Sequence, residues 1–564
     1  MSLNNAVVAR LLRQYAGTLV VEGADRFRVK AYRRAADTIE VLNTDVAEFM
    51  SRGEDLKSLP GIGEGISRTI EEIIQRGQMP QLERSIAQLK PELVELTLKP
   101  QLDPKKVQRI YKKLNIHSLE ELQERLDSGE IREVFGARIE FHVRNGLDER
   151  PRKLLYHAQP LADKALEFLK SLPGVYRVSS TGSLRRKQDT VGDLNFLIAS
   201  KSASALFKQF VGFGGLQPST SRNAQQAAYS LSDQFGITLR WTELDEWGLS
   251  WILSTGSVAH LDELTQRASK IKHQLTPDAL TSAGIDISEE EPIYRSLGLS
   301  FIEPELREGR GEIKAALKDQ LPDLIQLTDL RGDLHMHTTA SDGVNSLAEM
   351  ASAAKERGYE YISITDHSQS LKITNGLTED RLRQQIENIE KFNARSKSFT
   401  VLKSAEVDIL ADGSLDYSDA VLKELDLTVC SIHSRFGLNK EQQTDRVLRA
   451  MDNPYFNILG HATGRLLLKR EGYELDMERI IRHAKANGCF FEINSSPDRL
   501  DLSDENAKLA KEAGIKIAIN TDAHSLSDMD YMPLGVNQAR RAWLSANDVL
   551  NTLPLAGLLR CLRR

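Results

Sequence analysis

Two histidines separated by a single residue, His335 and His337, follow a short apolar segment. Side chains alternate between the two faces of a strand, so both imidazoles would point to the same side here. Imidazole nitrogens on one side of a strand end can bind a single metal ion. A pair of solvent-exposed or core histidines would give the same local pattern. The pair alone therefore raises metal binding as a question that the rest of the chain must answer.

From about residue 331 onward, apolar segments that read as strands alternate with segments that read as helices. Their ends recur about every 30 residues, which is typical of β/α units in a parallel barrel. The residues that act in such a barrel follow the carboxyl ends of its strands. We predict strands over residues 361–365, 427–432, 456–459, 489–493 and 515–519.

Histidines and acidic residues gather at the ends of these predicted strands. Among the histidines beyond residue 330, His483 alone lies inside a helix-like segment. Random placement of core or surface histidines would not give this distribution, and imidazoles and carboxylates at one barrel mouth suit Zn, Mn or Fe. The sequence therefore predicts a metal centre built from residues among His335, His337, Asp366, His367, Glu406, His433, His461, Asn494, Asp522 and His524.

Residues 151–240 combine a predicted helix at 161–172 with predicted strands at 175–180 and 191–198. A loop rich in glycine, serine and arginine joins the strands, and an aspartate follows. In this stretch the chain resembles the nucleotidyltransferase palm of the family X DNA polymerases. The resemblance implies a nucleotide-binding set consisting of Gly182, Ser183, Arg185, Arg186, Asp193, Gly256 and Ser257.

Three departures from that family concern its catalytic groups. Asp193 matches the first metal carboxylate, but Asn195 stands in place of the second and Thr238 in place of the third. Two-metal nucleotidyl transfer needs several anionic oxygens, and this set supplies a single negative charge. Thr69 stands where lyase members carry a nucleophilic lysine. We therefore predict a vestigial nucleotide site, no Mg²⁺ at the palm, lost polymerase activity and no lyase activity.

The N-terminal segment reads as helices with a basic face and a glycine-rich turn. Glycines bring a backbone close to a ligand, and the following helix start favours phosphate, so a helix-hairpin-helix here would bind the DNA backbone. A solvated helix surface and a plain interhelical turn are the alternatives. Further hairpin turns are expected near 98–106 and 135–138. The predicted DNA-contacting residues are Arg28, Lys30, Arg33, Gly61, Ile62, Gly63 and Gly65.

The C-terminal third resembles the polymerase-and-histidinol-phosphatase (PHP) domain, and the whole order of parts resembles bacterial family X DNA polymerases that carry one. The resemblance implies a distorted seven-stranded (β/α) barrel, catalytic through its metal ligands. The three metal ions that it implies would be held by His335, His337, Glu406 and Asp522, by Glu406, His433 and His461, and by Asp342, His367 and His524.

Other residues near the predicted centre have supporting roles to test. Arg465 and Arg499 are candidates for orienting a phosphate, although surface ion pairs would explain each equally well. Asp366 is expected to orient a histidine rather than bind metal. Mn²⁺ or Zn²⁺ is the expected cofactor.

The resemblance and the composition shifts divide the chain into helical, α+β and barrel parts. The predicted domains are a helix-hairpin-helix domain at 1–90, a fingers-like helical domain at 91–150, a palm at 151–245, a thumb at 246–315, a linker at 316–330 and the PHP barrel at 331–564.

Composition narrows the cellular setting. The 564 residues include three cysteines at scattered positions, which predicts neither a disulfide framework nor a cysteine zinc site. The formal net charge of -6 neither indicates nor excludes nucleic-acid binding. No signal-peptide or membrane-spanning pattern is visible. We expect a cytoplasmic monomer.

These patterns predict a family X polymerase-like DNA repair protein, active in base excision repair, whose PHP barrel is a metal-dependent 3′–5′ exonuclease. Its expected partners are gapped DNA or duplex 3′ ends, and other DNA repair proteins. The alternatives are a functional gap-filling polymerase, a non-catalytic DNA-end clamp, and a small-molecule phosphatase. The last would leave the DNA-binding-like residues before 331 unexplained.

Overall fold

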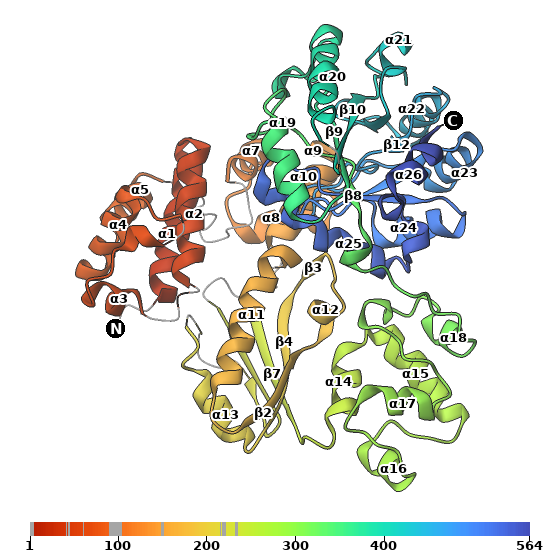
Figure 1. Cartoon of the computed structure of the whole chain (residues 1–564). Helices are drawn as coiled ribbons and strands as arrows, with labels where there is room; N and C mark the ends of the chain where they lie inside the picture. Colours follow the sequence, from red (N-terminus) through yellow and green to blue (C-terminus); the bar gives the residue numbers. More distant parts are fainter. Residues whose placement is uncertain are drawn as a thin grey trace.

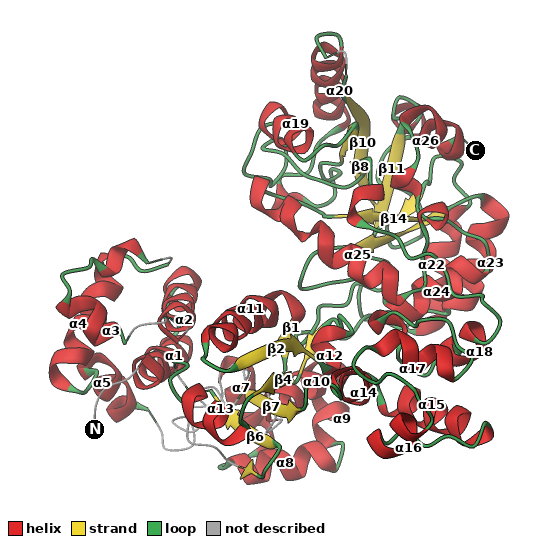
Figure 2. Cartoon of the chain, turned by 60° about the horizontal axis from the view of Figure 1, so that its bottom comes forward, coloured by secondary structure: helices red, strands yellow, loops and turns green. Residues whose placement is uncertain are grey.

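The computed structural model describes residues 5–40, 42, 45–59, 61–89, 104–147, 152–214, 216, 221–231, 235–396 and 398–563. None of the helices in these ranges is long and apolar enough to cross a membrane. Two views place the first five helices at one end of the molecule and a β/α barrel at the other (Figures 1 and 2). Most of the turn expected near 98–106 lies outside the described residues.

The described residues of the N-terminal part, up to 147, form helices and their connections. The first group packs around Leu12, Ala35 and Ile70, and the second around Ile110 and Leu122. The helices are α1 (Asn5–Glu22), α2 (Arg26–Glu40), α3 (Val46–Ser51), α4 (Glu64–Arg76), α5 (Pro80–Gln88), α7 (Pro104–Leu114), α8 (Leu119–Asp127), α9 (Glu130–Phe135) and α10 (Ala137–Leu147).

A mixed five-stranded sheet forms the centre of the chain, in the order β2-β4-β7-β6-β5. Strands β4 and β7 are parallel, and their alternating side chains separate a buried face from a more polar one. The strands are β1 (Lys153–Leu154), β2 (Val175–Ser180), β3 (Thr190–Val191), β4 (Asp193–Ser200), β5 (Ser221–Arg222), β6 (Gln226–Ser230) and β7 (Gly236–Thr242).

Two helices cover the buried face of this sheet. Helices α11 (Leu155–Ser171) and α13 (Ala203–Phe210) pack on it through a core that includes Leu169, Phe196 and Phe207 (Figure 1). The short helix α12 follows β2, and a helical unit with its own core around Ile252 and Tyr294 comes next. These helices are α12 (Gly182–Arg185), α14 (Trp247–Thr255), α15 (Val258–Lys270), α16 (Pro277–Ser282), α17 (Glu290–Ser296) and α18 (Glu312–Ala316).

Seven parallel strands form the C-terminal barrel, in the order β14-β13-β12-β11-β10-β9-β8. The first and last strands approach each other through a bridge between Met336 and Ala523, and the Asp522 amide donates to the His335 carbonyl at 2.9 Å. The barrel is thus nearly closed, which confirms the predicted fold class. Its strands are β8 (Gly332–Asp333), β9 (Tyr361–Ile364), β10 (Thr400–Asp408), β11 (Leu427–Ser431), β12 (Ile458–Leu459), β13 (Phe490–Asn494) and β14 (Ile517–Asn520).

Helices surround the barrel strands. Several begin at a side chain that caps the free backbone amides; Ser346, for example, forms a capping box with Glu349. The helices are α19 (Leu347–Glu356), α20 (Glu379–Asn393), α21 (Asp419–Leu422), α22 (Lys440–Met451), α23 (Met477–Asn487), α24 (Asp504–Glu512), α25 (Met532–Arg541) and α26 (Leu555–Leu562).

One carboxylate joins the sheet, the helical unit and the barrel. Glu308 Oε1 accepts from Arg186 Nε at 2.9 Å and from Arg541 Nη1 at 2.8 Å. Arg541 also donates to Asp504, which Arg310 Nη1 reaches at 2.8 Å. The Arg541 side chain is 2% exposed, so this junction is buried. The three parts are therefore held together by paired charges rather than by a bare linker.

Candidate metal centre

Side chains from the strand ends meet at the mouth of the barrel. The pair that follows β8 points inward together, with the His335 and His337 ring centroids 5.3 Å apart. Both side chains have no solvent exposure. The structure brings all nine predicted metal ligands into one cluster, namely His335, His337, Asp342, His367, Glu406, His433, His461, Asp522 and His524.

Glu406, on β10, lies at the centre of this cluster and is 1% exposed. Its Oε2 atom lies 3.6 Å from Nε2 of both His335 and His337. Its Oε1 atom lies 2.9 Å from His461 Nε2 and 3.3 Å from His433 Nε2. The two carboxylate oxygens therefore face two different sets of imidazoles. Such a carboxylate would be placed to contribute one oxygen to each of two bound cations.

Asp342 gathers a third set on the outer side of the cluster. Its carboxylate lies 3.4 Å from His524 Nε2 and 3.6 Å from His367 Nε2. Asp522 lies deeper, with Oδ1 at 3.1 Å from His337 Nε2. Three groups of side chains could each hold a metal ion: His337, Asp342, His367 and His524; His335, His337 and Asp522; and His367, Glu406 and His433. His337 and His367 each belong to two groups.

The unpaired polar atoms of the cluster fit the presence of cations. Nε2 of His335, Nδ1 of His337 and Oε2 of Glu406 are buried and have no hydrogen-bond partner among the described residues. Buried polar atoms are normally paired, because an unpaired one costs free energy. The donors are imidazole nitrogens and carboxylate oxygens with no thiolate. Such a set suits several divalent metals and does not single out one.

The charges within the cluster shift its protonation. Burial opposes charging, but the neighbouring carboxylates raise the pKa of His367 to about 10 and those of His433 and His524 to about 9. Burial and the charges of His524 and His367 lower the pKa of His337 to about 4. Burial would raise the pKa of Glu406, but the surrounding imidazolium charges hold it well below its usual range. A cation that binds here must displace protons from these imidazoles.

Two carboxylates that the sequence analysis did not single out orient the histidines. Glu492, on β13, is fully buried and lies 2.7 Å from His335 Nδ1. Asp408 lies 2.6 Å from His433 Nδ1. Each contact leaves the Nε2 atom of its histidine directed at the cluster. The signal was present in the sequence: Glu492 is an acid within an apolar strand, and Asp408 lies two residues after Glu406.

Asp366 does not orient a histidine as expected. Its carboxylate accepts from the Thr338 amide at 2.8 Å, from the Thr338 hydroxyl at 2.6 Å and from Gln385 Nε2 at 2.8 Å. The Ser341 hydroxyl adds a further hydrogen bond. These contacts fix the loop that leads from His337 toward Asp342. The prediction was wrong because that loop folds back over Asp366 and takes up its oxygens.

The two arginines suggested for phosphate binding differ in their surroundings. Arg499 Nε lies 3.7 Å from Asp522 Oδ2, at the edge of the cluster. Arg465 donates from Nε to the Arg499 carbonyl at 3.0 Å, and its Nη2 lies 3.3 Å from Asp189 of the central sheet region. Arg465 therefore supports the Arg499 segment, and Arg499 is the arginine that faces the site.

The central sheet places two of the three departures from the polymerase family side by side. The register of β4 and β7 pairs Asn195 with Thr238. Asn195 Nδ2 donates to Asp193 Oδ1 at 2.8 Å. Asp193 and Asn195 lie on the sheet face opposite the α11 core, since alternate residues such as Phe196 are buried there. One carboxylate, one amide and one hydroxyl thus occupy this part of the surface.

The arginines of the expected phosphate loop are engaged elsewhere. Arg185 forms a two-pronged contact with Glu290, at 2.7 Å for each nitrogen, and its guanidinium carbon lies 3.3 Å from the centroid of the Trp251 ring. Arg186 bonds Glu308 and the Thr255 carbonyl. In this arrangement both guanidinium groups hold the sheet against the next helical unit.

The remaining residues of the expected nucleotide site lie close to these arginines and have local structural roles. Gly182 has a φ of +60°, and an added Cβ would lie 3.5 Å from Asn195 Nδ2. Ser257 caps α15 by accepting from the His260 amide at 3.1 Å. At Gly256 an added Cβ would lie 2.9 Å from His260 Cδ2. Close packing therefore requires glycine there. Ser183 lies in α12.

The N-terminal glycine turn presents a helix start to solvent. Gly61 has a φ of +79°, and Gly63 precedes the first residue of α4. Ile62 is 4% exposed and anchors the turn in the core. Gly65 is exposed, so backbone amides at this helix start are accessible to an anion. Thr69 is buried and donates to the Gly65 carbonyl at 2.9 Å.

The basic residues predicted to accompany that turn lie on α2. Arg28 and Arg33 are exposed, and Arg28 Nη2 donates to the Tyr15 hydroxyl at 2.9 Å. The Lys30 side chain lies outside the described residues. The structure thus leaves two of the three cations on a solvent-facing helix.

Comparison with known proteins gives three family matches along the chain. The model of a helix-hairpin-helix domain matches residues 3–79, that of the DNA polymerase beta thumb matches 250–308, and that of the PHP domain matches 333–496. The chain is 34% identical over 569 residues to the Bacillus subtilis (strain 168) protein named DNA polymerase/3′-5′ exonuclease PolX, with 99% of each chain covered.

Shorter proteins match a part of the chain. A probable phosphatase of Thermoanaerobacter sp. (strain X514) is 30% identical over 39% of this chain and 89% of its own length. A probable phosphatase of Acetivibrio thermocellus is 30% identical over 34% of this chain and 78% of its own.

Proposed function

The chain belongs to the bacterial family X DNA polymerases that carry a C-terminal PHP domain, and we propose that it shortens DNA 3′ ends by metal-dependent phosphodiester hydrolysis in its barrel. The observation that carries this proposal is the complete set of ligand side chains around Glu406, with unpaired buried atoms aimed inward. The full-length relative, whose printed name includes a 3′-5′ exonuclease, supports the same reaction.

Each part of the cluster has a task in this reaction. The three ligand groups would hold Mn²⁺ or Zn²⁺, which would activate water and stabilise the charge on the leaving oxygen. Glu492 and Asp408 hold the imidazoles of His335 and His433 with Nε2 directed inward. Arg499, at the rim, would pair with a non-bridging phosphate oxygen and orient the scissile bond.

The palm, by contrast, is proposed to have lost polymerase activity. Asp193 alone supplies negative charge where Asn195 and Thr238 stand beside it. The Asn195 amide points at the Asp193 carboxylate and occupies an oxygen that a metal would need. Such a site lacks the anionic ligands that would hold two Mg²⁺ ions. The palm and the N-terminal helices would then serve to hold the DNA.

DNA backbone binding by the N-terminal turn completes this proposal. The exposed start of α4 offers backbone amides to a phosphate without reading the base sequence. Arg28 and Arg33 add positive charge on α2. Gapped duplexes and 3′ ends are the proposed substrates, and the protein would act in DNA repair with Mn²⁺ as its main activating ion.

A gapped duplex with a labelled primer tests the reaction directly. With Mn²⁺ and no deoxynucleotides, the full chain should shorten the primer, and the double variant His335→Ala, His337→Ala should not. The control is His483→Ala, which changes a histidine on α23 that pairs with Asp452 outside the centre. Equal shortening by the double variant would overturn the proposal.

A second function is supported by the name of the full-length relative, which includes a DNA polymerase. Adding deoxynucleotides and Mg²⁺ to the same gapped duplex tests it. Primer extension that survives in the His335→Ala, His337→Ala variant would show a working palm. Tight binding to the gap with neither shortening nor extension would instead indicate a DNA-end clamp.

A further inference from the structure

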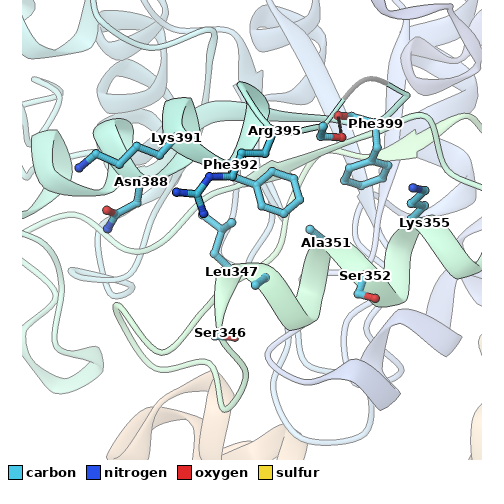
Figure 3. Close-up of a pocket in the computed structure, with 12 residues that line it drawn as sticks. Ser346, Leu347, Ala351, Ser352, Lys355, Asn388, Lys391, Phe392, Arg395 and Phe399 are labelled. Atoms are coloured by element: carbon cyan, nitrogen blue, oxygen red, sulfur yellow. Dashed lines mark hydrogen bonds between the residues drawn. The ribbon is translucent and has the colours of Figure 1, made fainter.

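A cavity of about 590 Å³ lies on the outside of the barrel, between α19 and α20. We call it the α19–α20 slot. Its α19 wall carries small side chains, including Ala351 and Ser352, and its α20 wall carries Phe392. Figure 3 shows the Phe392 ring lying over the α19 side chains, with Phe399 beside it. Small residues facing an aromatic ring leave room for a flat group to stack on that ring.

Positively charged side chains surround this mostly apolar slot. Lys355, Lys391 and Arg395 line it and are exposed. Lys391 lies 3.4 Å from Glu387, but both side chains are more than half exposed, so this pair is weak. Lys355 and Arg395 form no ion pair within the described part of the chain. The Asn388 amide adds a group on the α20 wall that can donate and accept hydrogen bonds.

The slot adjoins a second cavity, part of whose lining directly follows a candidate metal ligand in the chain. This cavity, of about 340 Å³, shares Leu347 and Asn388 with the slot. It extends to Thr338, the residue after the candidate ligand His337. A flexible chain that passes Thr338 could therefore continue along the second cavity into the slot.

We propose that the α19–α20 slot binds a nucleotide of the single strand whose 3′ end lies in the barrel mouth. The base stacks on Phe392, and the neighbouring phosphates meet Lys355, Lys391 and Arg395. A basic groove combined with an aromatic platform is the usual way in which proteins hold single strands without sequence preference. This inference rests on the proposed exonuclease function. An acidic peptide with an apolar side chain would match the same chemistry, but the link to the barrel mouth favours the nucleic-acid strand.

Charge reversal tests the contacts with phosphate. The variant carries Lys355→Glu, Lys391→Glu and Arg395→Glu in the full chain, and the probe is a short fluorescein-labelled oligothymidylate in metal-free buffer. Binding should weaken, and the slope of log affinity against log salt should fall by about 2, at about 0.7 per phosphate contact. The matched control reverses three exposed charges on the other side of the barrel, as Lys440→Glu, Arg482→Glu and Lys485→Glu.

Filling the slot tests the stacking contact separately. Ala348 is exposed on the α19 wall, so Ala348→Trp should occupy the slot without entering the protein core. We expect roughly tenfold weaker oligothymidylate binding with an unchanged salt slope, because a base contact is lost and no charge is changed. Phe392→Ala should give the same pattern.

The outcomes separate this inference from the function on which it rests. Slot variants that bind oligothymidylate like the charge-matched control would overturn the slot, even if the wild type shortens 3′ ends. Slot-dependent binding in a protein that shortens no 3′ end would support the slot and refute the exonuclease proposal. Preferential binding of a labelled acidic phenylalanine-containing peptide, lost in Ala348→Trp, would overturn the slot as a nucleotide site.

Discussion

Glu492 offers the sharpest test of how the barrel orients its metal ligands. Its buried carboxylate accepts from His335 Nδ1 at 2.7 Å and from Asn520 Nδ2 at 2.9 Å through Oε1. Through Oε2 it accepts from the His461 amide at 2.8 Å and from Asn494 Nδ2 at 3.2 Å. In Glu492→Gln the new NH₂ group must replace one oxygen. At either position it faces two donors and can satisfy neither.

The magnitude follows from those contacts. An unsatisfied buried donor costs about 1–3 kcal/mol, and loss of a carboxylate behind a ligand histidine typically weakens metal binding about 10–100-fold. We expect the apparent Mn²⁺ dissociation constant of Glu492→Gln to rise by that factor, which is roughly 1.4–2.7 kcal/mol. Because the side chain at position 492 is not itself a predicted ligand, the hydrolysis rate at saturating Mn²⁺ should recover to within a few-fold of the wild type.

Calorimetric Mn²⁺ titration and hydrolysis rates at increasing Mn²⁺ measure these two quantities. The matched control is Glu478→Gln, which makes the same change at an exposed position on α23. A folded Glu492→Gln variant with wild-type Mn²⁺ affinity would refute the reasoning. A lower melting temperature with unchanged metal affinity would assign Glu492 a structural role only.

Three further predictions follow from other parts of the structure. Placing carboxylates in the palm with Asn195→Asp and Thr238→Asp should lower the melting temperature in the absence of Mg²⁺, because like charges meet beside Asp193. Adding Mg²⁺ should raise the melting temperature of this variant and permit primer extension. No response to Mg²⁺ would contradict the assigned positions. Burial would raise the pKa of Glu290, but paired arginines lower it to about 2, so its ionised form stabilises the fold above about pH 4.5 and this contribution is lost as pH falls toward 2. The melting-temperature deficit of Glu290→Gln should therefore shrink between pH 7 and pH 3, and a constant deficit would contradict the ion-pair reasoning. Chelation should lower the melting temperature of the wild type more than that of His335→Ala, which lacks a ligand of one of the three groups, and equal shifts would place the stabilising metals elsewhere.

The barrel and its inward ligands could be predicted from the sequence because their signals are local. Apolar strands at regular spacing indicate the β/α repeat, and a histidine that follows a strand must lie at the barrel mouth. Each predicted strand from 361–365 to 515–519 overlaps an observed one. The grouping of ligands was harder, because His337 and His367 each approach two sets of partners.

Contacts between segments far apart in the chain could not be predicted in this way. Arg185 matched a phosphate-binding pattern, yet its guanidinium is paired with Glu290, far along the chain. Asp366 follows a strand as a ligand would, but a returning loop takes up its oxygens. In both cases the partner of the side chain depended on tertiary packing that no local pattern encodes.

The shared carboxylate of Glu308 has a consequence for the palm itself. If the barrel were expressed without the preceding domains, Arg541 would lose its contact with Glu308 and keep that with Asp504. The charged side chains buried at this junction would then be exposed to water. The palm would thus support the neighbouring barrel whether or not it catalyses nucleotidyl transfer. The contacts of Glu308 with Arg186 and Arg541 would also fix the distance that a DNA end must cover between the palm and the barrel mouth, because the palm and the barrel cannot separate without breaking them.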